Sequence, residues 1–277
     1  MQQLFHSIRD NKILWLLVFV PMPLLGSVLF ADKHTLLFVL SILAIVSLAA
    51  LLSTATEAVA AKTGDAVGGL LNATLGNLTE LIIALAALRA GEYMLVKAAI
   101  AGAIVTNTLF MMGAALLIGG LRHKIQEFNL PTARLQIAML FLAAFGLMIP
   151  SGIAAADNQP VTQSLSLGIA LILLITYGLG LLFSLGTHRT YFSNAHDDHS
   201  EGDAEEHLPI PVAFGTLAGV TVLVALVSEV FIESLTKASS TVGLSSAFVG
   251  FVVVALVGAA AEMTSADARR TPNSGRR

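Results

Sequence analysis

The sequence predicts an all-α protein that crosses a membrane several times, and two observations support this fold class. Only 12% of the 277 residues are charged and 56% are hydrophobic, whereas soluble proteins carry roughly 25% charged residues. The apolar residues also form nearly uncharged runs of about 17 to 22 residues, the length that spans a bilayer as a helix. Examples are LWLLVFVPMPLLGSVLF near the N-terminus and LSLGIALILLITYGLGLLFSLG in the second half.

About eight apolar segments are predicted as transmembrane helices. In chain order they cover residues 13–30, 35–58, 66–88, 94–119, 134–151, 164–186, 210–235 and 243–265. The first follows Arg9 and Lys12, as in a signal peptide, but it exceeds the apolar region of about 7 to 15 residues in such peptides, and no A-x-A-like cleavage motif follows it. We therefore count it as a membrane helix.

The distribution of basic residues predicts the orientation. If the N-terminus lies inside, the outer loops carry only Lys33, Arg89, Lys97 and Lys237, and the other Lys and Arg residues lie in inner loops. This satisfies the positive-inside rule. We expect a multi-pass protein of the cell (inner or plasma) membrane, embedded in the lipid bilayer, with a cytoplasmic N-terminus.

The linker after the sixth segment, HRTYFSNAHDDHSEGDAEEHLP, is the one strongly polar stretch of the sequence. Two interpretations remain open: a solvated connector, because like charges at this density repel, or a surface that gathers cations weakly. It lacks EF-hand spacing. The net charge of −3 argues against nucleic acid as a partner, and the lack of cysteine excludes disulfides and thiolate metal sites.

Two apolar segments resemble each other. GGLLNATLGNLTE (68–80) aligns with GFVVVALVGAAAE (250–262) at two glycines, an alanine and the final glutamate, so that Glu80 matches Glu262. By the predicted orientation the two segments cross the membrane in opposite directions. Inverted repeats with glycine-broken apolar segments are the sequence pattern of a secondary transporter with a site near the bilayer midplane.

Glu80 stands among leucine, isoleucine and alanine in GNLTELIIA, and a charge at the centre of a membrane helix is unfavourable by at least about 2.5 to 3.5 kcal/mol. If Glu262 faces it, neither carboxylate ionises easily, because burial and mutual repulsion raise both pKa values. A divalent cation or protons relieve this repulsion, so the two compete for one site. The glycines either loosen the helices so that carbonyls reach an ion or permit close helix packing, and both roles are compatible.

GNLTELIIA, preceded by STATEAVAAKTGDAVGGLLNATL, resembles the first signature of the proton-coupled calcium exchangers, the CAX branch of the calcium:cation antiporter superfamily. Further similar segments are IAGAIVTNTLFMMGAALLIGGLR, the acidic linker, SEVFIESL and GLSSAFVGFVVVALVGAAAEM. The resemblance covers nearly the whole chain. It implies an N-terminal helix followed by two inverted five-helix repeats joined by an acidic cytoplasmic helix, with calcium ions and protons as transported substrates and no cofactor.

The resemblance also implies a set of site residues. Glu80 and Glu262 would bind calcium and protons, with Asn77, Thr79 and Asn107 as supporting ligands. Candidates for the proton pathway are Glu57, Glu229 and Glu233, of which the last two lie one helical turn apart; Glu57 has the alternative of a boundary residue paired with Lys62.

Two departures from the family pattern bear on the function. The family has GNAAEH where residues 258–263 read GAAAEM, so an alanine replaces the amide that would mirror Asn77. The family continues with three more helices, whereas this sequence ends in the polar ADARRTPNSGRR, which suggests a truncated product. The expected domains are an N-terminal segment (1–34), a first five-helix repeat (35–187), the linker (188–209) and a partial inverted repeat with a basic tail (210–277).

Three kinds of function are therefore weighed. The first is a secondary transporter that exchanges Ca²⁺ for H⁺, or an exchanger of this superfamily selective for Na⁺, K⁺ or Mn²⁺. The second is a fragment of such a protein that does not transport. An intramembrane metalloenzyme is disfavoured because HExxH is missing and the histidines lie outside the apolar segments or near their ends, so an enzyme is not expected. The oligomeric state, a homo-oligomer included, stays open.

Overall fold

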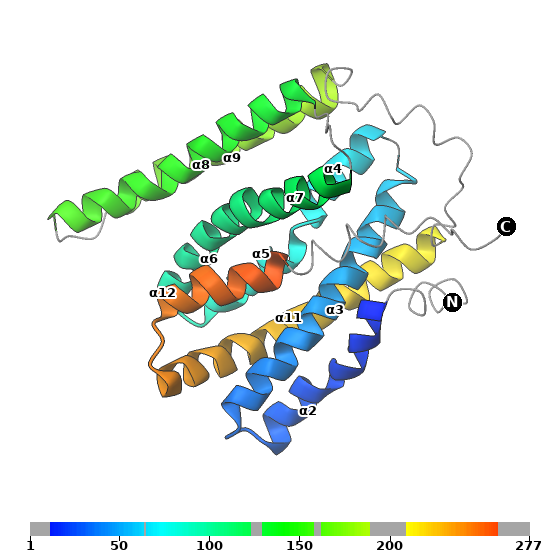
Figure 1. Ribbon diagram of the computed structural model, residues 1–277, viewed down its shortest axis with the longest axis vertical. Coiled ribbons are helices and arrows are strands. Elements are labelled where there is room, and N and C mark those ends of the chain that lie inside the picture. The colour runs from blue at the N-terminus through cyan, green and yellow to red at the C-terminus, as the bar shows by residue number, and fades with distance from the viewer. Residues whose placement is uncertain (1–11, 64, 123–128, 158–161, 189–208, 260–277) are drawn as a thin grey trace. The chain divides into compact units, whose positions relative to one another are not determined.

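The computed structural model describes residues 12–63, 65–122, 129–157, 162–188 and 209–259, and all regular secondary structure within them is helical (Figure 1). The first half contains η1 (Lys12–Phe19), α2 (Pro21–Leu29), α3 (His34–Ala60), α4 (Asp65–Leu75), α5 (Leu78–Arg89), α6 (Tyr93–Val105), η2 (Thr106–Met111) and α7 (Met112–Arg122). The second half contains α8 (Leu130–Asp157), α9 (Gln163–Leu181), η3 (Leu182–Thr187), α11 (Ile210–Val242), α12 (Ser246–Phe248) and η5 (Val249–Val254).

Each apolar segment predicted from the sequence forms helix in the described residues. Five helices are long and apolar enough to cross a membrane, or six if the bent pair α4 and α5 is one span. The first and last predicted segments appear as shorter apolar helices, Ile13–Leu29 and Ser246–Ala259. Pro21 and Pro23 explain the interruption of the first one, because proline removes a backbone donor and clashes with the preceding turn. The all-α membrane fold is confirmed.

By its internal contacts the chain divides into two units, residues 1–111 with 205–277 and residues 112–204. In the first unit, α3 and α11 form the main helix pair and run antiparallel (Figure 1). The rings of Phe38 and Phe231 stack with centroids 5.6 Å apart near one end of the pair, and Ala58 and Val59 pack on Ala213 near the other. Small side chains such as Ala58 and Ala213 at this contact let the two helices approach closely.

A glycine cap ends α11 and directs the chain into the last described helix. Gly243 adopts a left-handed conformation with φ of 76°, which glycine tolerates because it has no Cβ. The N–H of Leu244 donates to the carbonyl of Ser239 at 2.9 Å, the long bond of a Schellman motif. Ser245 then caps α12 by accepting from the N–H of Phe248 at 3.2 Å.

Helix α6 and the π-helical segment η5 touch through two glycines. A Cβ placed on Gly102 would collide with the backbone of Phe251, and one on Gly250 would lie 2.5 Å from the carbonyl oxygen of Leu95. Both glycines are buried. Close packing, one of the two roles that the sequence suggested for Gly250, is therefore what the structure shows for this residue.

The second unit contains α7 and the antiparallel hairpin of α8 and α9. Asn129 caps α8 by accepting from the N–H of Thr132 at 3.0 Å, a common way to satisfy a free donor at a helix start. Gly146 of α8 faces Leu173 of α9, and Gly180 of α9 faces Met139 of α8. In the most apolar part of each helix, none of α8 and only 6% of α9 is buried within the described residues.

Candidate functional site

A break between α4 and α5 positions the first signature. The two helices are bent by 41° at residues 76 and 77. The N–H of Gly76 donates to Asn72 O at 3.0 Å, and a Cβ at Gly76 would lie 2.5 Å from the same oxygen, so only glycine fits without a shift. Asn77 then acts as the N-cap residue, with φ of −102° and ψ of 20°, and the new helix begins at Leu78.

Glu80 lies in the first turn of α5 as a result. The first backbone N–H groups of a helix have no partner within that helix and carry partial positive charge. A carboxylate in this turn is therefore stabilised by its own helix. One of its oxygens, Oε2, is buried.

Glu80 opens into a cavity of about 90 Å³ within the first unit. The lining is mainly apolar and comes from α5, α6, α11 and the helix after η5; its polar side chains are those of Glu80 and Asn107. Asn107 reaches the cavity from η2, where the chain passes from α6 into a π-helical turn, a feature that often occurs at functional sites. About 10 to 15 Å³ of such space is enough to hold one water molecule, so the cavity has room for an ion together with water.

The second signature helix lies directly against Glu80. A Cβ added to Gly258 would come within 2.9 Å of Glu80 Oε1 and 3.2 Å of its Cγ, so the missing side chain of Gly258 is the space that the carboxylate occupies. Gly258 and the neighbouring Ala259 both line the cavity. Glu262, the predicted partner of Glu80, lies outside the described residues.

The structure brings some of the other predicted ligands together and not others. Asn107 shares the cavity with Glu80, whereas Asn77 and Thr79 are not among its lining residues. Thr79 is buried, with 3% of its surface exposed, and Asn77 lies exposed at the helix break. Their role as ligands stays a prediction.

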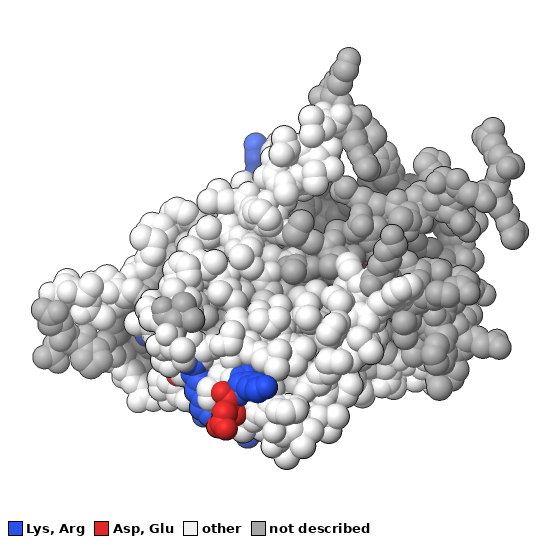
Figure 2. Space-filling model, turned by 60° about the horizontal axis from the view of Figure 1, so that its bottom comes forward, with Lys and Arg blue, Asp and Glu red and all other residues white. Residues whose placement is uncertain are grey.

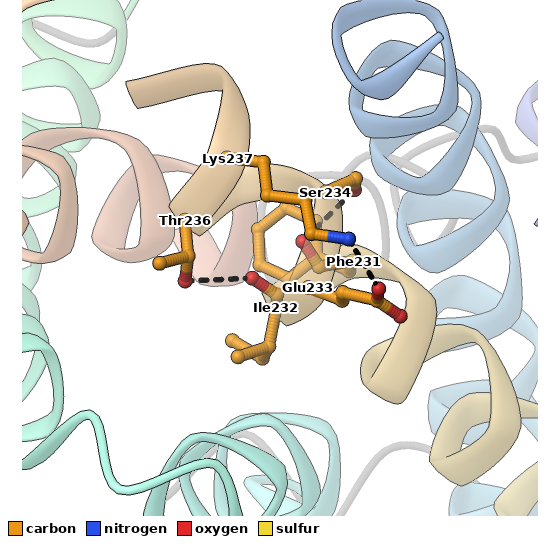
Figure 3. A network of polar contacts seen from close by, with 6 residues as sticks. All are labelled: Phe231, Ile232, Glu233, Ser234, Thr236 and Lys237. Atoms are coloured by element: carbon orange, nitrogen blue, oxygen red, sulfur yellow. Dashed lines mark hydrogen bonds and ion pairs between the residues drawn. The ribbon is translucent and has the colours of Figure 1, made fainter. Parts of the chain in front are cut away.

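The three predicted proton-pathway residues lie on α3 and α11. Glu57 is half-buried near the end of α3 and accepts from Ser53 Oγ at 3.2 Å. Glu229 forms an ion pair of 3.0 Å with Arg89. Glu233 forms one of 2.7 Å with Lys237, one turn later on the same helix (Figure 3). On the face of the molecule drawn in Figure 2, most of the visible charged atoms gather in one small area.

The contact between Arg89 and Glu229 was missed by reasoning from the sequence. The two residues are 140 positions apart, and from the sequence Arg89 is recognisable only as a basic residue of a predicted loop. The available signal was its position at the end of α5, directly after the first signature, at the predicted outer end where few other basic residues occur.

A model of the family described as "Sodium/calcium exchanger protein" matches residues 33–186. The chain belongs to this family. It is 39% identical over 262 residues to a Ca²⁺/H⁺ antiporter of Aphanothece halophytica, a match that covers 89% of this chain and 70% of the relative. It is 34% identical over 259 residues to the Ca²⁺/H⁺ antiporter ChaA of Bacillus subtilis, covering 92% and 74%.

Solved structures agree with this assignment to the exchanger family. Native YfkE has a TM-score of 0.69 at 29% identity, covering 95% of this chain and 71% of that one. The selenium-substituted Ca²⁺/H⁺ antiporter YfkE has a TM-score of 0.72 at 31% identity, covering 93% and 71%. The resemblance drawn from the signature residues is confirmed, and the named relatives of this exchanger are transporters.

Proposed function

We propose that this exchanger moves Ca²⁺ in one direction across the membrane and H⁺ in the other at the cavity that holds Glu80. The observation that carries the proposal is the position of this carboxylate, in the first turn of a broken helix, in a mainly apolar cavity shared with one amide side chain. Carboxylate and amide oxygens are ligands that Ca²⁺ accepts in irregular geometry. Protons bind the same carboxylate, so one site serves both ions in turn.

The contact of Gly258 with Glu80 supports the predicted pairing of two inverted repeats. Gly258 is the counterpart of Gly76 in the alignment of the two signatures, and Glu262 is the counterpart of Glu80. Because an inverted repeat applies the same relation in both directions, we expect the carboxylate of Glu262 to lie against Gly76, across the same cavity. The two acids then bind one divalent cation together, with Asn77, Thr79 and Asn107 as additional ligands.

The remaining residues define a route for protons under this proposal. Glu57 would serve the cytoplasmic end of α3, and Glu229 or Glu233 the opposite end of α11. The protein would lie in the plasma membrane. The distribution of Lys and Arg predicts that its N-terminus and acidic linker face the cytoplasm. Residues 35–187 and 210–277 would be the first repeat and the start of the second.

A second candidate is exchange of Ca²⁺ for Na⁺. The matching family is that of the sodium/calcium exchangers, which favours this candidate, and carboxylate and amide oxygens bind both ions. The chain covers 70% and 74% of the lengths of the two bacterial relatives described above.

Uptake of calcium-45 into everted membrane vesicles separates these candidates. We expect uptake when a pH gradient, acidic inside, is imposed, and its loss by more than about tenfold in Glu80→Gln, which keeps the shape of the side chain and removes its charge. Uptake driven by a Na⁺ gradient would favour the second candidate. If the intact, inserted chain shows neither, the exchange proposal is wrong for this polypeptide.

A further inference from the structure

A second pocket lies beside the Glu80 cavity, at the end of the first unit where α5 turns into α6. It has a volume of about 420 Å³ and is lined by both apolar and charged side chains. The charged ones are Arg89, Glu92, Glu229, Glu233 and Lys237. Carboxylates therefore outnumber basic groups in the lining of this pocket.

Ile232 separates this pocket from the Glu80 cavity. It is 1% exposed and lines both spaces. On the side of α5 the adjacent residues Ala86 and Ala87 line the pocket and the cavity, respectively. One isoleucine side chain and one turn of α5 thus divide the two spaces, and a small separation of α5 from α11 would join them.

Two polar contacts across this boundary link α11 to the last residue of α5 and to the N-cap residue of α6. Arg89 at the end of α5 pairs with Glu229 at 3.0 Å, and Thr236 Oγ1 donates to Glu92 Oε1 at 3.5 Å. Glu229 and Thr236 precede and follow Ile232 by three and four residues, so all three lie on one face of α11. The Arg89 and Glu229 side chains are 80% and 55% exposed, and exposed ion pairs contribute little to stability. This pair can therefore open without unfolding the protein.

We propose that this pocket is the vestibule through which the cavity opens at the α5–α6 end, and that Arg89 sets the affinity of this side for calcium. The inference rests on the proposed exchange function and adds a residue to it. While Arg89 is paired with Glu229, its guanidinium neutralises the carboxylate charge that would otherwise attract a cation arriving from that side. Arg89 is a positioning residue in this account, because it acts through Glu229 and does not touch the bound ion.

The consequence is an asymmetry between the two membrane faces. A tethered cation lowers the local concentration of free cations in a pocket with acidic walls, so calcium released into the vestibule leaves it and returns rarely. Removal of the guanidinium leaves Glu92, Glu229 and Glu233 with Lys237 as the remaining basic group of the lining. Calcium then accumulates at this face and inhibits net export.

The test uses the full chain reconstituted in liposomes, with calcium-45 exchange measured against the calcium concentration on each face separately. In Arg89→Gln we expect the concentration that half-saturates the site from the α5–α6 face to fall by about three- to tenfold, and that of the other face to stay as in the unchanged protein. Arg89→Lys should restore the original value. Glu229→Gln should raise the half-saturating calcium concentration at this face. The double variant should have a value close to that of the unchanged protein.

Lys97→Gln is the matched control, because Lys97 is an exposed basic residue on the nearby α6 and does not line the pocket. It should leave both faces unchanged. If Arg89→Gln alters both faces alike, or neither face, while the unchanged protein exchanges calcium, Arg89 does not have this role. If the unchanged protein exchanges no calcium, the proposed function fails first, so the two failures are distinguishable.

Discussion

Helix α3 and the α8–α9 hairpin are similarly apolar, yet protein covers them to very different extents. In α3, 56% of the most apolar stretch is buried, against none of α8 and 6% of α9. Helix α3 packs against α11, α4 and the N-terminal helices, whereas α8 and α9 pack mainly on each other. Hydropathy predicts that a segment enters the membrane. Packing against neighbouring helices decides whether its side chains are held in fixed positions.

Glycines differ in the atoms that a Cβ would meet. In the first unit, a Cβ on Gly76, Gly102 or Gly250 would meet backbone atoms within 3 Å, and one on Gly258 would meet the Glu80 carboxylate; Gly215 and Gly219 of α11 have open surroundings. In the hairpin, a Cβ on Gly146 or Gly180 would meet within 3 Å only the flexible side-chain ends of Leu173 or Met139, and Gly152, Gly168 and Gly178 have no such neighbour within 4 Å in the described residues. The difference predicts which substitutions the protein tolerates.

The largest effect is expected from Gly258→Val. Its side chain would displace the Glu80 carboxylate, which is flexible, and leave the helix backbone in place. If the interaction of calcium with this one carboxylate is weakened by about 1.4 kcal/mol, calcium affinity falls about tenfold. Calcium binding and exchange should fall by at least this factor while the amount of inserted protein is unchanged.

Gly168→Val in the hairpin is the control for this substitution and should leave exchange unaltered, because the space around Gly168 is open. Normal exchange in Gly258→Val would mean that Glu80 does not need its observed position.

A smaller effect, on stability, is expected from Gly102→Ala. The added methyl group meets the backbone of Phe251, which cannot rotate away as a side chain can. Overpacking of this kind destabilises by about 1 to 3 kcal/mol. Thermal unfolding in detergent should show a lower midpoint for Gly102→Ala, and no decrease for Gly152→Ala, whose Cβ enters open space in α8. Equal midpoints would remove the contrast between the two regions.

The smallest effect concerns buried hydroxyl groups. Ser41 Oγ is fully buried and has no hydrogen-bond partner among the described residues, whereas Ser47 on the same helix donates to Ala44 O at 2.9 Å. Leaving a buried hydroxyl unpaired is unfavourable, so Ser41→Ala should raise the stability, and Ser47→Ala should lower it by about 1 kcal/mol. In the hairpin, the exposed Ser151 already donates to Leu147 O, and Ser151→Ala should change little.

The same unfolding measurements decide this prediction. A loss of stability in Ser41→Ala as large as that in Ser47→Ala would indicate that the Ser41 hydroxyl has a partner, for example a water molecule between α3 and α11.

Much of the candidate site was predicted from the sequence because its elements are local. A charged residue in an apolar run, a glycine four positions before it and an amide at the helix break are all visible in GNLTE, and they produce the bend that places Glu80. The repeat also predicted that Gly258 and Glu80 belong to facing helices, and the structure brings them into contact. Glu262 was predicted by the same argument and stays a prediction, since it lies outside the described residues.

What the sequence determined by itself is the number of apolar segments, the glycine and the glutamate of the first signature, and the family, since each depends on composition or on residues close together in the chain. The tertiary structure decided which apolar helices are buried by protein, that Arg89 pairs with Glu229, and that Ile232 divides the Glu80 cavity from the charged pocket. These facts join positions far apart in the chain. An ion pair 140 residues apart has no periodicity to detect; it exists because α5 and α11 are packed side by side.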